Sequence, residues 1–173
     1  LNGIKIEVGV LENLLELTSK ELAKLESKIH KLAGADFNIN SPAQLGEIIF
    51  NKLQIRGRVR KTGGGAMSTA APELEKLRDE HPIIDLILQY RELQKLKTTY
   101  IEPFPLLVDK SDRRLHTTYS QTSTTTGRLA SQDPNLQNIP IRTELGQEFR
   151  KAFIAEKGCY LVSLDYSQIE LRI

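Results

Sequence analysis

The sequence predicts an α+β protein in which an antiparallel helical half is followed by an incomplete half of mixed strands and loops. Residues 1–101 are rich in Leu, Glu and Lys at helical spacing. Residues 104–173 are instead rich in Thr, Ser, Asn and β-branched residues, with several turn signals. The length of 173 residues suits one domain or two small ones. We therefore expect a helical subdomain over residues 1–102 and a second subdomain over residues 103–173.

Composition excludes several classes of protein. The chain has 24 Lys plus Arg and 22 Asp plus Glu, a formal net charge of +2, so any signal for nucleic-acid binding must be local. A single Cys excludes a disulfide scaffold and a Cys-rich zinc site. No apolar run approaches the roughly 20 residues that a membrane helix needs, and the first residues lack the pattern of a secretory signal. We expect a cytoplasmic protein that does not contact a membrane.

A long amphipathic helix is predicted over about residues 10–33. Gly34 follows it in the place of a C-terminal cap. Apolar residues at steps of three, four or seven form one stripe along this helix, and they are Leu15, Leu22, Leu25, Ile29 and Leu32.

A second helix is predicted to begin at Pro42. Ser41 supplies a capping hydroxyl, Pro42 occupies the first helical position, and Gln44 lies three residues after the cap. The buried side of this helix is expected to carry Leu45, Ile48, Ile49 and Leu53.

The following segment, about residues 54–70, is predicted to be an exposed basic tip. No acidic residue occurs from Ile48 through Pro72. The glycines Gly63 to Gly65 are costly to order, so we expect a mobile loop. A solvated loop is one interpretation of its cations, but a track for phosphates fits their density better. These cations are Arg56, Arg58, Arg60 and Lys61.

Two further helices complete the helical half. A short one is predicted from about Pro72 to Glu80, and the dipeptide His81-Pro82 breaks it and starts another. The second continues to about Ile101, before two closely spaced prolines end the helical half.

In the second half, a hydroxyl-rich stretch over residues 117–126 predicts a pair of strands with a polar face. Leu115 to Tyr119 alternates enough for one strand. Mucin-like glycosylation is the weaker interpretation, because the stretch contains no proline. The dipeptides Asp133-Pro134 and Ile139-Pro140 mark turns in the segment that follows.

A short apolar strand is predicted from Tyr160 to Leu164, with Cys159 before it as a small core residue. Ser167 and Glu170 then have the spacing of a capping box that opens a helix. The sequence stops about one turn into that helix, which is too short to be stable alone. We expect either a fragment or a chain completed by a second chain.

Asp165 is the first candidate for chemistry. It follows the predicted apolar strand directly, so its carboxylate would project from a rigid edge, where ligand and metal sites tend to lie. A carboxylate at this point can also simply cap a turn, and the spacing alone does not separate these interpretations.

Several longer segments resemble one known family, and they occur along the chain in the same order as in that family. The segment Asp165-Tyr166-Ser167-Gln168-Ile169-Glu170-Leu171-Arg172 resembles the first carboxylate motif of family A DNA polymerases, the bacterial DNA polymerase I type. Three stretches are similar to the palm segment before that motif: Thr126 to Leu129, Asp133 to Pro140, and Ile141-Arg142. Two stretches are similar to the thumb of that family: Tyr90 to Tyr100, and Phe37 to Ser41.

The resemblance implies that the two halves are two different subdomains of a polymerase. Residues 1–102 would be the thumb, whose tip lies against duplex DNA, and residues 103–173 the start of the palm. The partners would be primer-template DNA and dNTP, together with fingers and a C-terminal palm supplied by the same chain or by a second subunit. We expect the chain alone to be inactive. The alternative is a non-catalytic subunit of a split polymerase that binds primer-template.

The resemblance also implies the active-site roles. The complete site would use two Mg²⁺ ions, with Asp165 as catalytic residue and metal ligand and the Tyr166 carbonyl as a second ligand. Glu170, besides its local capping role, would pack under the incoming sugar and exclude a 2′-hydroxyl. The residues expected to contact the nucleotide are Ser167, Gln168, Ile169 and Glu170.

The remaining implied contacts are with DNA. Arg128 would lie in the minor groove at the primer end, where acceptors occur at every base pair, although it could be a surface Arg beside a tight turn. The other palm candidates are Asn135, Gln137, Asn138 and Arg142, for which turn formation is the alternative. The thumb candidates besides the tip are Arg91 and Lys95 on one helix face, and Ser68 and Thr69, which could instead cap a helix.

Overall fold

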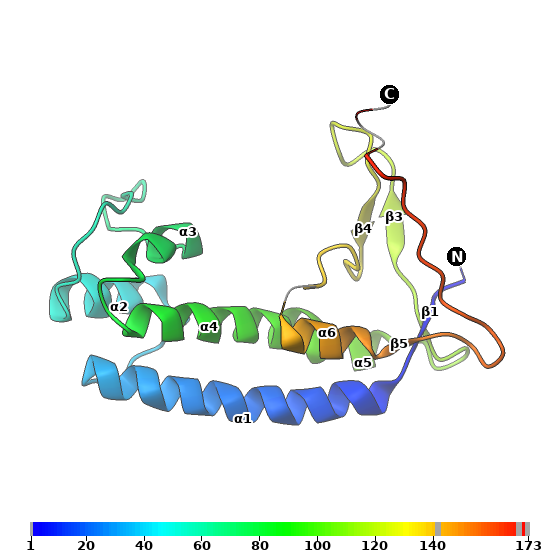
Figure 1. The fold of residues 1–173 in the computed structure, drawn as a ribbon, viewed down its shortest axis with the longest axis horizontal. Coiled ribbons are helices and arrows are strands. Elements are labelled where there is room, and N and C mark those ends of the chain that lie inside the picture. The colour runs from blue at the N-terminus through cyan, green and yellow to red at the C-terminus, as the bar shows by residue number, and fades with distance from the viewer. Residues whose placement is uncertain (1, 141–142, 169–170, 172–173) are drawn as a thin grey trace. The chain divides into compact units, whose positions relative to one another are not determined.

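The structure is a computed structural model that describes residues 2–140, 143–168 and 171 (Figure 1). The chain divides into two compact units. The helical unit is Asn13–Glu102, and the mixed unit combines Leu1–Glu12 with Pro103–Ile173. The texture of the sequence places the first twelve residues with the helical half, whereas the structure groups them with the second half.

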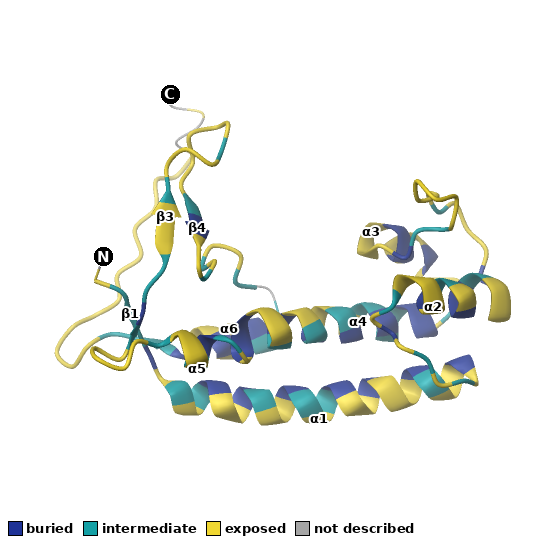
Figure 2. Ribbon diagram, turned by 180° about the vertical axis from the view of Figure 1, so that it is seen from behind, coloured by how far each residue is buried: buried dark blue, intermediate teal, exposed yellow. Residues whose placement is uncertain are grey.

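Helix α1, Val8–Ala33, has one buried face along its length (Figure 2). The buried face includes Thr18, whose hydroxyl donates to the carbonyl of Leu14 at 2.5 Å and so needs no partner outside the helix. Leu32, which the sequence placed in the apolar stripe, is 40% exposed. Gly34 adopts a φ of +62°, as the predicted C-terminal cap requires.

The second helix begins as predicted and then continues as a π-helix. Helix α2, Pro42–Gly46, is capped by Ser41, whose hydroxyl oxygen accepts from the Gln44 amide at 3.4 Å. The Gln44 side chain accepts from the amide of Asn38 at 2.7 Å, so it braces the incoming loop. A π-helix, η1, continues over Glu47–Lys52 and buries Ile48 and Ile49.

The glycine-rich tip is a hydrogen-bonded hairpin turn where the sequence predicted a mobile loop. Lys61 and Met67 form an antiparallel bridge. The amide of Thr62 donates to the Ala66 carbonyl at 2.7 Å. Gly65 has a φ of +83°, a left-handed conformation that glycine adopts readily, so this glycine serves the turn itself.

The remaining helices of the helical unit match the predicted positions. Helix α3, Ala71–Leu74, continues as a 3₁₀-helix, η2, over Glu75–Leu77. Helix α4, Ile83–Leu96, continues as a π-helix, η3, over Lys97–Ile101. The buried face of α4 consists of Ile83, Ile84, Ile87, Tyr90, Leu93 and Leu96.

The mixed unit is built on a three-stranded antiparallel sheet with the order β2-β1-β5. The central strand β1, Ile4–Ile6, was not predicted. Its neighbours are β2, Arg114–Leu115, and β5, Phe153–Ile154. Two short helices belong to this unit, α5 at Phe104–Leu107 and α6 at Glu144–Arg150. Mixed helices and small antiparallel sheets confirm the predicted α+β class.

Aromatic packing forms the core of the mixed unit. Phe104 and Phe149 are fully buried, and their ring centroids lie 5.5 Å apart in an edge-to-face arrangement. Phe153 of β5 packs edge-to-face on both, at 6.4 Å from Phe104 and 5.6 Å from Phe149. The cluster therefore joins α5, α6 and β5.

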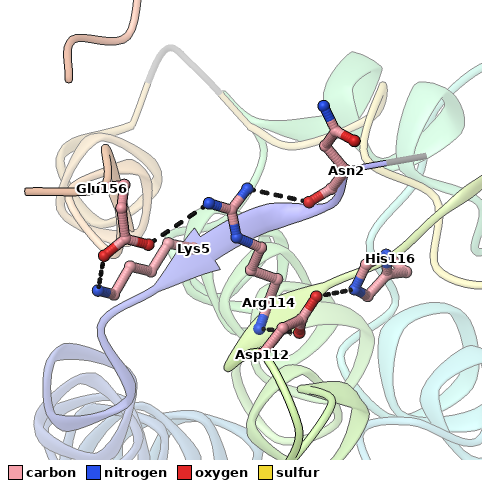
Figure 3. A network of polar contacts seen from close by, with 6 residues as sticks. All are labelled: Asn2, Lys5, Asp112, Arg114, His116 and Glu156. Atoms are coloured by element: carbon pink, nitrogen blue, oxygen red, sulfur yellow. Dashed lines mark hydrogen bonds and ion pairs between the residues drawn. The ribbon is translucent and has the colours of Figure 1, made fainter.

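Ion pairs link β1 and β2 to Glu156, two residues beyond the end of β5 (Figure 3). The Glu156 carboxylate pairs with Lys5 of β1 at 2.8 Å and with Arg114 of β2 at 3.4 Å. These contacts lower the pKa of Glu156, with the hydrogen bond from Lys5 as the largest cause. Arg114 also donates to the carbonyl of Asn2 at 3.0 Å. Side chains thus tie β1 and β2 to the segment after β5, in addition to the backbone bonds of the sheet.

The predicted polar strand pair is present. Strand β3, Thr118–Ser120, pairs antiparallel with β4, Ala130–Gln132, and places Tyr119 opposite Ser131. The predicted strand from Leu115 to Tyr119 is split, because Leu115 belongs to β2 and residues 118–120 to β3.

The predicted strand from Tyr160 to Leu164 is wrong. These residues lie outside the named strands, and Tyr160, Val162 and Leu164 are 90%, 75% and 91% exposed. An apolar run becomes a strand only when a neighbour supplies hydrogen bonds to its edge. Cys159, expected in the core, is exposed as well.

The predicted capping box lies partly outside the described residues, because Glu170 does. Ser167 and Gln168 form a turn, and the amide of Leu171 donates to the Gln168 carbonyl at 3.1 Å.

Among the helices that the structure describes, none is long and apolar enough to cross a membrane.

Candidate nucleic-acid interface

The basic tip presents its cations to solvent. Arg56, Arg58, Arg60 and Lys61 are all exposed, and the Arg60 side chain is 87% exposed. Hairpin bonds support the backbone at Arg60 and Lys61, because the Ser68 amide donates to the Arg60 carbonyl at 2.8 Å and Lys61 bridges to Met67. The tip is therefore an ordered cationic surface of the kind that binds phosphates without reading bases.

A buried carboxylate, which sequence reasoning missed, holds the base of this tip. Glu73 of α3 is buried, and its carboxylate accepts from the Arg60 amide at 2.9 Å and from Lys76 at 2.7 Å. The pKa of Glu73 is lowered, chiefly by the hydrogen bond from Lys76 and then by the Arg60 amide. The available signal was an acidic residue in the first turn of a helix, directly after the acid-free stretch.

The structure joins Thr69 and Arg91, two of the predicted thumb contacts. The Arg91 guanidinium donates to the Thr69 carbonyl, and burial lowers the pKa of Arg91. The Ser68 hydroxyl accepts from the Ala70 amide at 3.2 Å, a local turn bond just before α3, whose N-cap residue is Ala70 with no side-chain cap. Part of the hydrogen-bonding capacity of these residues therefore braces the start of α3.

Arg91 and Lys95 line one open groove of about 450 Å³ between α3–η2 and α4. Acidic side chains share the groove, and Arg78 pairs there with Glu75 at 2.5 Å and with Asp85 at 3.3 Å. Lys95 is exposed. Because the charges of the groove are mixed, the tip offers phosphates the more favourable surface.

Arg128 lies in the turn between β3 and β4. Gly127 precedes it with a φ of +74°, and the Thr124 hydroxyl donates to the Arg128 carbonyl at 2.6 Å. The Arg128 side chain is exposed. The turn thus fixes the backbone of Arg128 while its guanidinium is presented at the surface.

The predicted amide residues gather in the loop after β4. The Asn135 carboxamide oxygen accepts from the amides of Gln137 at 2.9 Å and Asn138 at 3.3 Å, which is the turn-forming use of Asn. Gln137 uses both ends of its side chain within the protein, because its oxygen accepts from the Ser131 amide and its nitrogen donates to the Leu129 carbonyl. Sequence reasoning missed buried Ser131, for which no signal was available.

The residues expected around the reaction centre lie in the C-terminal segment. Asp165, Tyr166, Ser167 and Gln168 are exposed, outside the named strands and helices. Within the described part of the chain, no three His, Cys, Asp or Glu side chains come together as a metal site would require. The expected contacts Arg142, Ile169 and Glu170 lie outside the described residues.

The chain is similar to bacterial DNA polymerases along its whole length. It is 54% identical to the thermostable DNA polymerase I of Thermus filiformis over 99% of this chain and 20% of the relative. It is 53% identical to that of Thermus aquaticus, over 99% of this chain and 21% of the relative. With DNA polymerase I of Deinococcus radiodurans the identity is 50%, over 100% of this chain and 18% of the relative. The chain thus spans about a fifth of these relatives.

A solved structure and a family model agree with these relatives. The polymerase domain of Pol1 from M. smegmatis, in complex with DNA primer-template and dNTP, is similar with a TM-score of 0.86 and 36% identity. That similarity covers 98% of this chain and 30% of the other. The model of the family described as DNA polymerase family A matches residues 8–173. The chain belongs to DNA polymerase family A.

Proposed function

We propose that this chain is the thumb and the first part of the palm of a template-directed DNA polymerase. The complete enzyme would transfer a nucleotide from dNTP to the 3′-hydroxyl of a primer. The observation that carries the proposal is the match over 98% of the chain to a polymerase domain solved with primer-template and dNTP. Residues 13–102 would grip the duplex, and the mixed unit would present the reacting end. Because primer-template DNA is the partner, we place the protein in the cytoplasm.

The tip supplies the grip in this proposal. Its exposed cations, Arg56, Arg58, Arg60 and Lys61, would neutralise phosphates and release counterions, which gives affinity without sequence preference. In the mixed unit, Arg128 and Asn138 would face the minor groove, whose acceptors are present at every base pair. Arg91, Lys95, Ser68, Thr69 and Arg142 would add contacts with the DNA backbone.

Asp165 is the proposed catalytic residue. Its carboxylate and the Tyr166 carbonyl are hard oxygen donors, the kind that Mg²⁺ prefers, and both belong to an exposed segment that a ligand can reach. When bound, two such ions would lower the pKa of the primer hydroxyl and neutralise charge on the triphosphate. Two donors are too few to hold them, so we expect no primer extension by this chain alone. Ser167, Gln168, Ile169 and Glu170 would contact the nucleotide, with Glu170 excluding a 2′-hydroxyl.

The second candidate is a primer-template-binding subunit of a split polymerase, with fingers and the rest of the palm on another chain. The same residues would bind DNA in both cases. The intact mass of the native polypeptide distinguishes them. A mass well above 19.5 kDa supports one continuous polymerase, and a mass of 19.5 kDa supports the split subunit.

The catalytic role is tested by Asp165→Asn in a polymerase that carries this segment. We expect primer extension to fall more than about a hundredfold, because losing a carboxylate that positions metal ions removes several kcal/mol of transition-state stabilisation. Affinity for primer-template should stay within about twofold. Asp79→Asn, at an exposed position of the helical unit, is the matched control. Full extension by Asp165→Asn would contradict the proposed role.

A further inference from the structure

The Gln137 side chain completes the hydrogen bonding of one edge of β4. Its oxygen accepts from the Ser131 amide at 2.8 Å, and its nitrogen donates to the Leu129 carbonyl at 2.9 Å. In a strand, the carbonyl of one residue and the amide two residues later face the same edge. The Ser131 amide and the Leu129 carbonyl therefore point away from β3. The Gln137 carboxamide bonds to both, as a neighbouring strand would.

Two hydroxyls, of buried Ser131 and half-buried Thr117, support the same loop from the other side. The Ser131 hydroxyl accepts from the Leu136 amide at 3.0 Å and lies 2.7 Å from the Thr117 hydroxyl. The Thr117 hydroxyl lies 2.7 Å from the Pro134 carbonyl. The Ser131 hydroxyl also lies 3.3 Å from the Pro134 carbonyl, and the Thr117 hydroxyl lies 3.0 Å from the Gln132 carbonyl, so either hydroxyl can be the donor in the pair. This chain of bonds fixes the loop at Pro134 and Leu136.

The turn itself is closed by Asn135, whose side-chain oxygen accepts from the amides of Gln137 and Asn138. The backbone of Gln137 is thus held by Asn135 while its side chain holds β4. The bonds to Ser131 and Leu129 use half of the hydrogen-bonding capacity of the Gln137 carboxamide, one N–H and one lone pair, in holding the protein itself. Asn138 is exposed at the end of the same turn.

We propose that Gln137 is a positioning residue rather than a DNA contact. Its side chain joins the turn at residues 135–138 to β4, and the hydroxyls of Ser131 and Thr117 hold the same turn through Leu136 and Pro134. Asn138 and the turn that contains Arg128 are thereby held in a fixed position relative to each other. The proposal rests on the proposed function for what the turn is presented to. The brace itself concerns only groups of the protein.

The first test measures the brace without DNA, by hydrogen exchange in a polymerase that carries this segment. In Gln137→Ala, the amide of Ser131 should exchange about three- to tenfold faster, because one hydrogen bond is removed. Gln121→Ala, at an exposed position in the turn before β4, should leave that exchange unchanged. Unchanged exchange at Ser131 in Gln137→Ala would overturn the proposal, whether or not the protein extends primers.

The second test separates positioning from contact during primer extension. Primers carrying 3-deazapurines lack one minor-groove acceptor at a chosen base pair. If Gln137 positions the turn, Gln137→Ala lowers extension but keeps the wild-type pattern of sensitivity to these substitutions. If Gln137 donates to a base, its variant loses sensitivity at one base pair, and the proposal is overturned.

Thr117 gives an independent check on the hydroxyl contacts of this loop. Thr117→Ser keeps the hydroxyl and should retain wild-type extension and Leu136 exchange. Thr117→Val has the same shape but no hydroxyl, so it should accelerate exchange at Leu136 and lower extension. Equal behaviour of the two variants would overturn the proposal. If a complete polymerase that carries the unaltered segment extends no primer, the proposed function is contradicted, and the exchange results alone judge the brace.

Discussion

The backbone amide of Arg60 donates to the carboxylate of Glu73 at 2.9 Å, so a buried acid holds the first strand of the cationic hairpin. Lys76 satisfies the same carboxylate from the next turn of the helix at 2.7 Å. A buried carboxylate without such partners would be costly. Here the carboxylate holds the Arg60 backbone in place, and the exposed Arg60 guanidinium also lies 3.9 Å from it.

Glu73 predicts a pH dependence of stability. Its pKa is lowered in the folded protein by Lys76 and by the Arg60 amide, so the folded state takes up this proton less readily than the unfolded state. The stabilisation is therefore complete above the ordinary value of 4.5 and is lost as the pH falls through the lowered value. Glu73→Gln should lower the Tm at pH 7, and its difference from wild type should shrink as the pH falls through that range. A difference independent of pH would contradict this, and Glu80→Gln at an exposed position is the control.

Gly57 predicts a steric effect beside the tip. A Cβ atom there would lie 2.3 Å from a methyl carbon of Leu77, which is fully buried. Gly57→Ala should therefore destabilise the helical unit by about 1–3 kcal/mol, as overpacking does. Gly63→Ala is the matched control, because nothing lies within 4 Å of the added carbon. Denaturant midpoints for the two variants would coincide if Leu77 could move aside freely.

The cations of the tip predict the salt dependence of binding. Removing them should make the slope of log affinity for primer-template against log salt shallower by about 0.9 for each phosphate that the tip no longer neutralises. The variant replaces Arg56, Arg58, Arg60 and Lys61 with Ala. The control removes the same charge from exposed positions of α1, namely Lys20, Lys24, Lys28 and Lys31. Fluorescence anisotropy over a salt series measures both, and equal slopes for the two variants would contradict a specific role for the tip.

The aromatic cluster predicts where the mixed unit is most sensitive. Phe149 is fully buried and contacts both Phe104 and Phe153 edge-to-face. Phe149→Ala should cost about 3–5 kcal/mol through reduced burial and a residual cavity. Phe149→Leu keeps more of the volume and should cost less. Hydrogen exchange of β1 and β5 measures the effect, and equal protection in both variants would show that packing at this position is unimportant.

The helices of the helical unit were predictable because their signals are local, whereas α5 and α6 were not predicted. Ser41 and Gly34 lie beside the helix ends that they cap, so their roles can be read from a few residues of sequence. Strand β1 was not predictable in this way. It is three residues long, and its partners are Leu115 and Ile154, far along the chain.

The opposite error, at Tyr160 to Leu164, has the same origin. Apolar and β-branched residues indicate that a segment can be a strand, but a strand also needs a neighbour, and local sequence does not specify one.

The candidate interface was predictable in its charges and less so in its bonds. Exposed Arg and Lys near glycines can be recognised from composition, and the tip cations are exposed as expected. The bonds of Glu73 to Arg60 and of Gln137 to Ser131 join side chains to the backbone of folded loops. Such bonds exist only once the loop has its shape, so residue types and spacing did not reveal them.

The central position of β1 has a consequence for how the chain is assembled and engineered. Because Leu1–Glu12 groups with Pro103–Ile173, the helical unit is an insertion within the mixed unit. On a ribosome, residues 13–102 can complete their own contacts while β1 still waits for β2 and β5 to emerge. The entropy of closing that loop grows only slowly with its length, so the insertion is tolerated. The helical unit should be separable as one continuous piece, whereas the mixed unit needs a linker that joins Glu12 to Pro103.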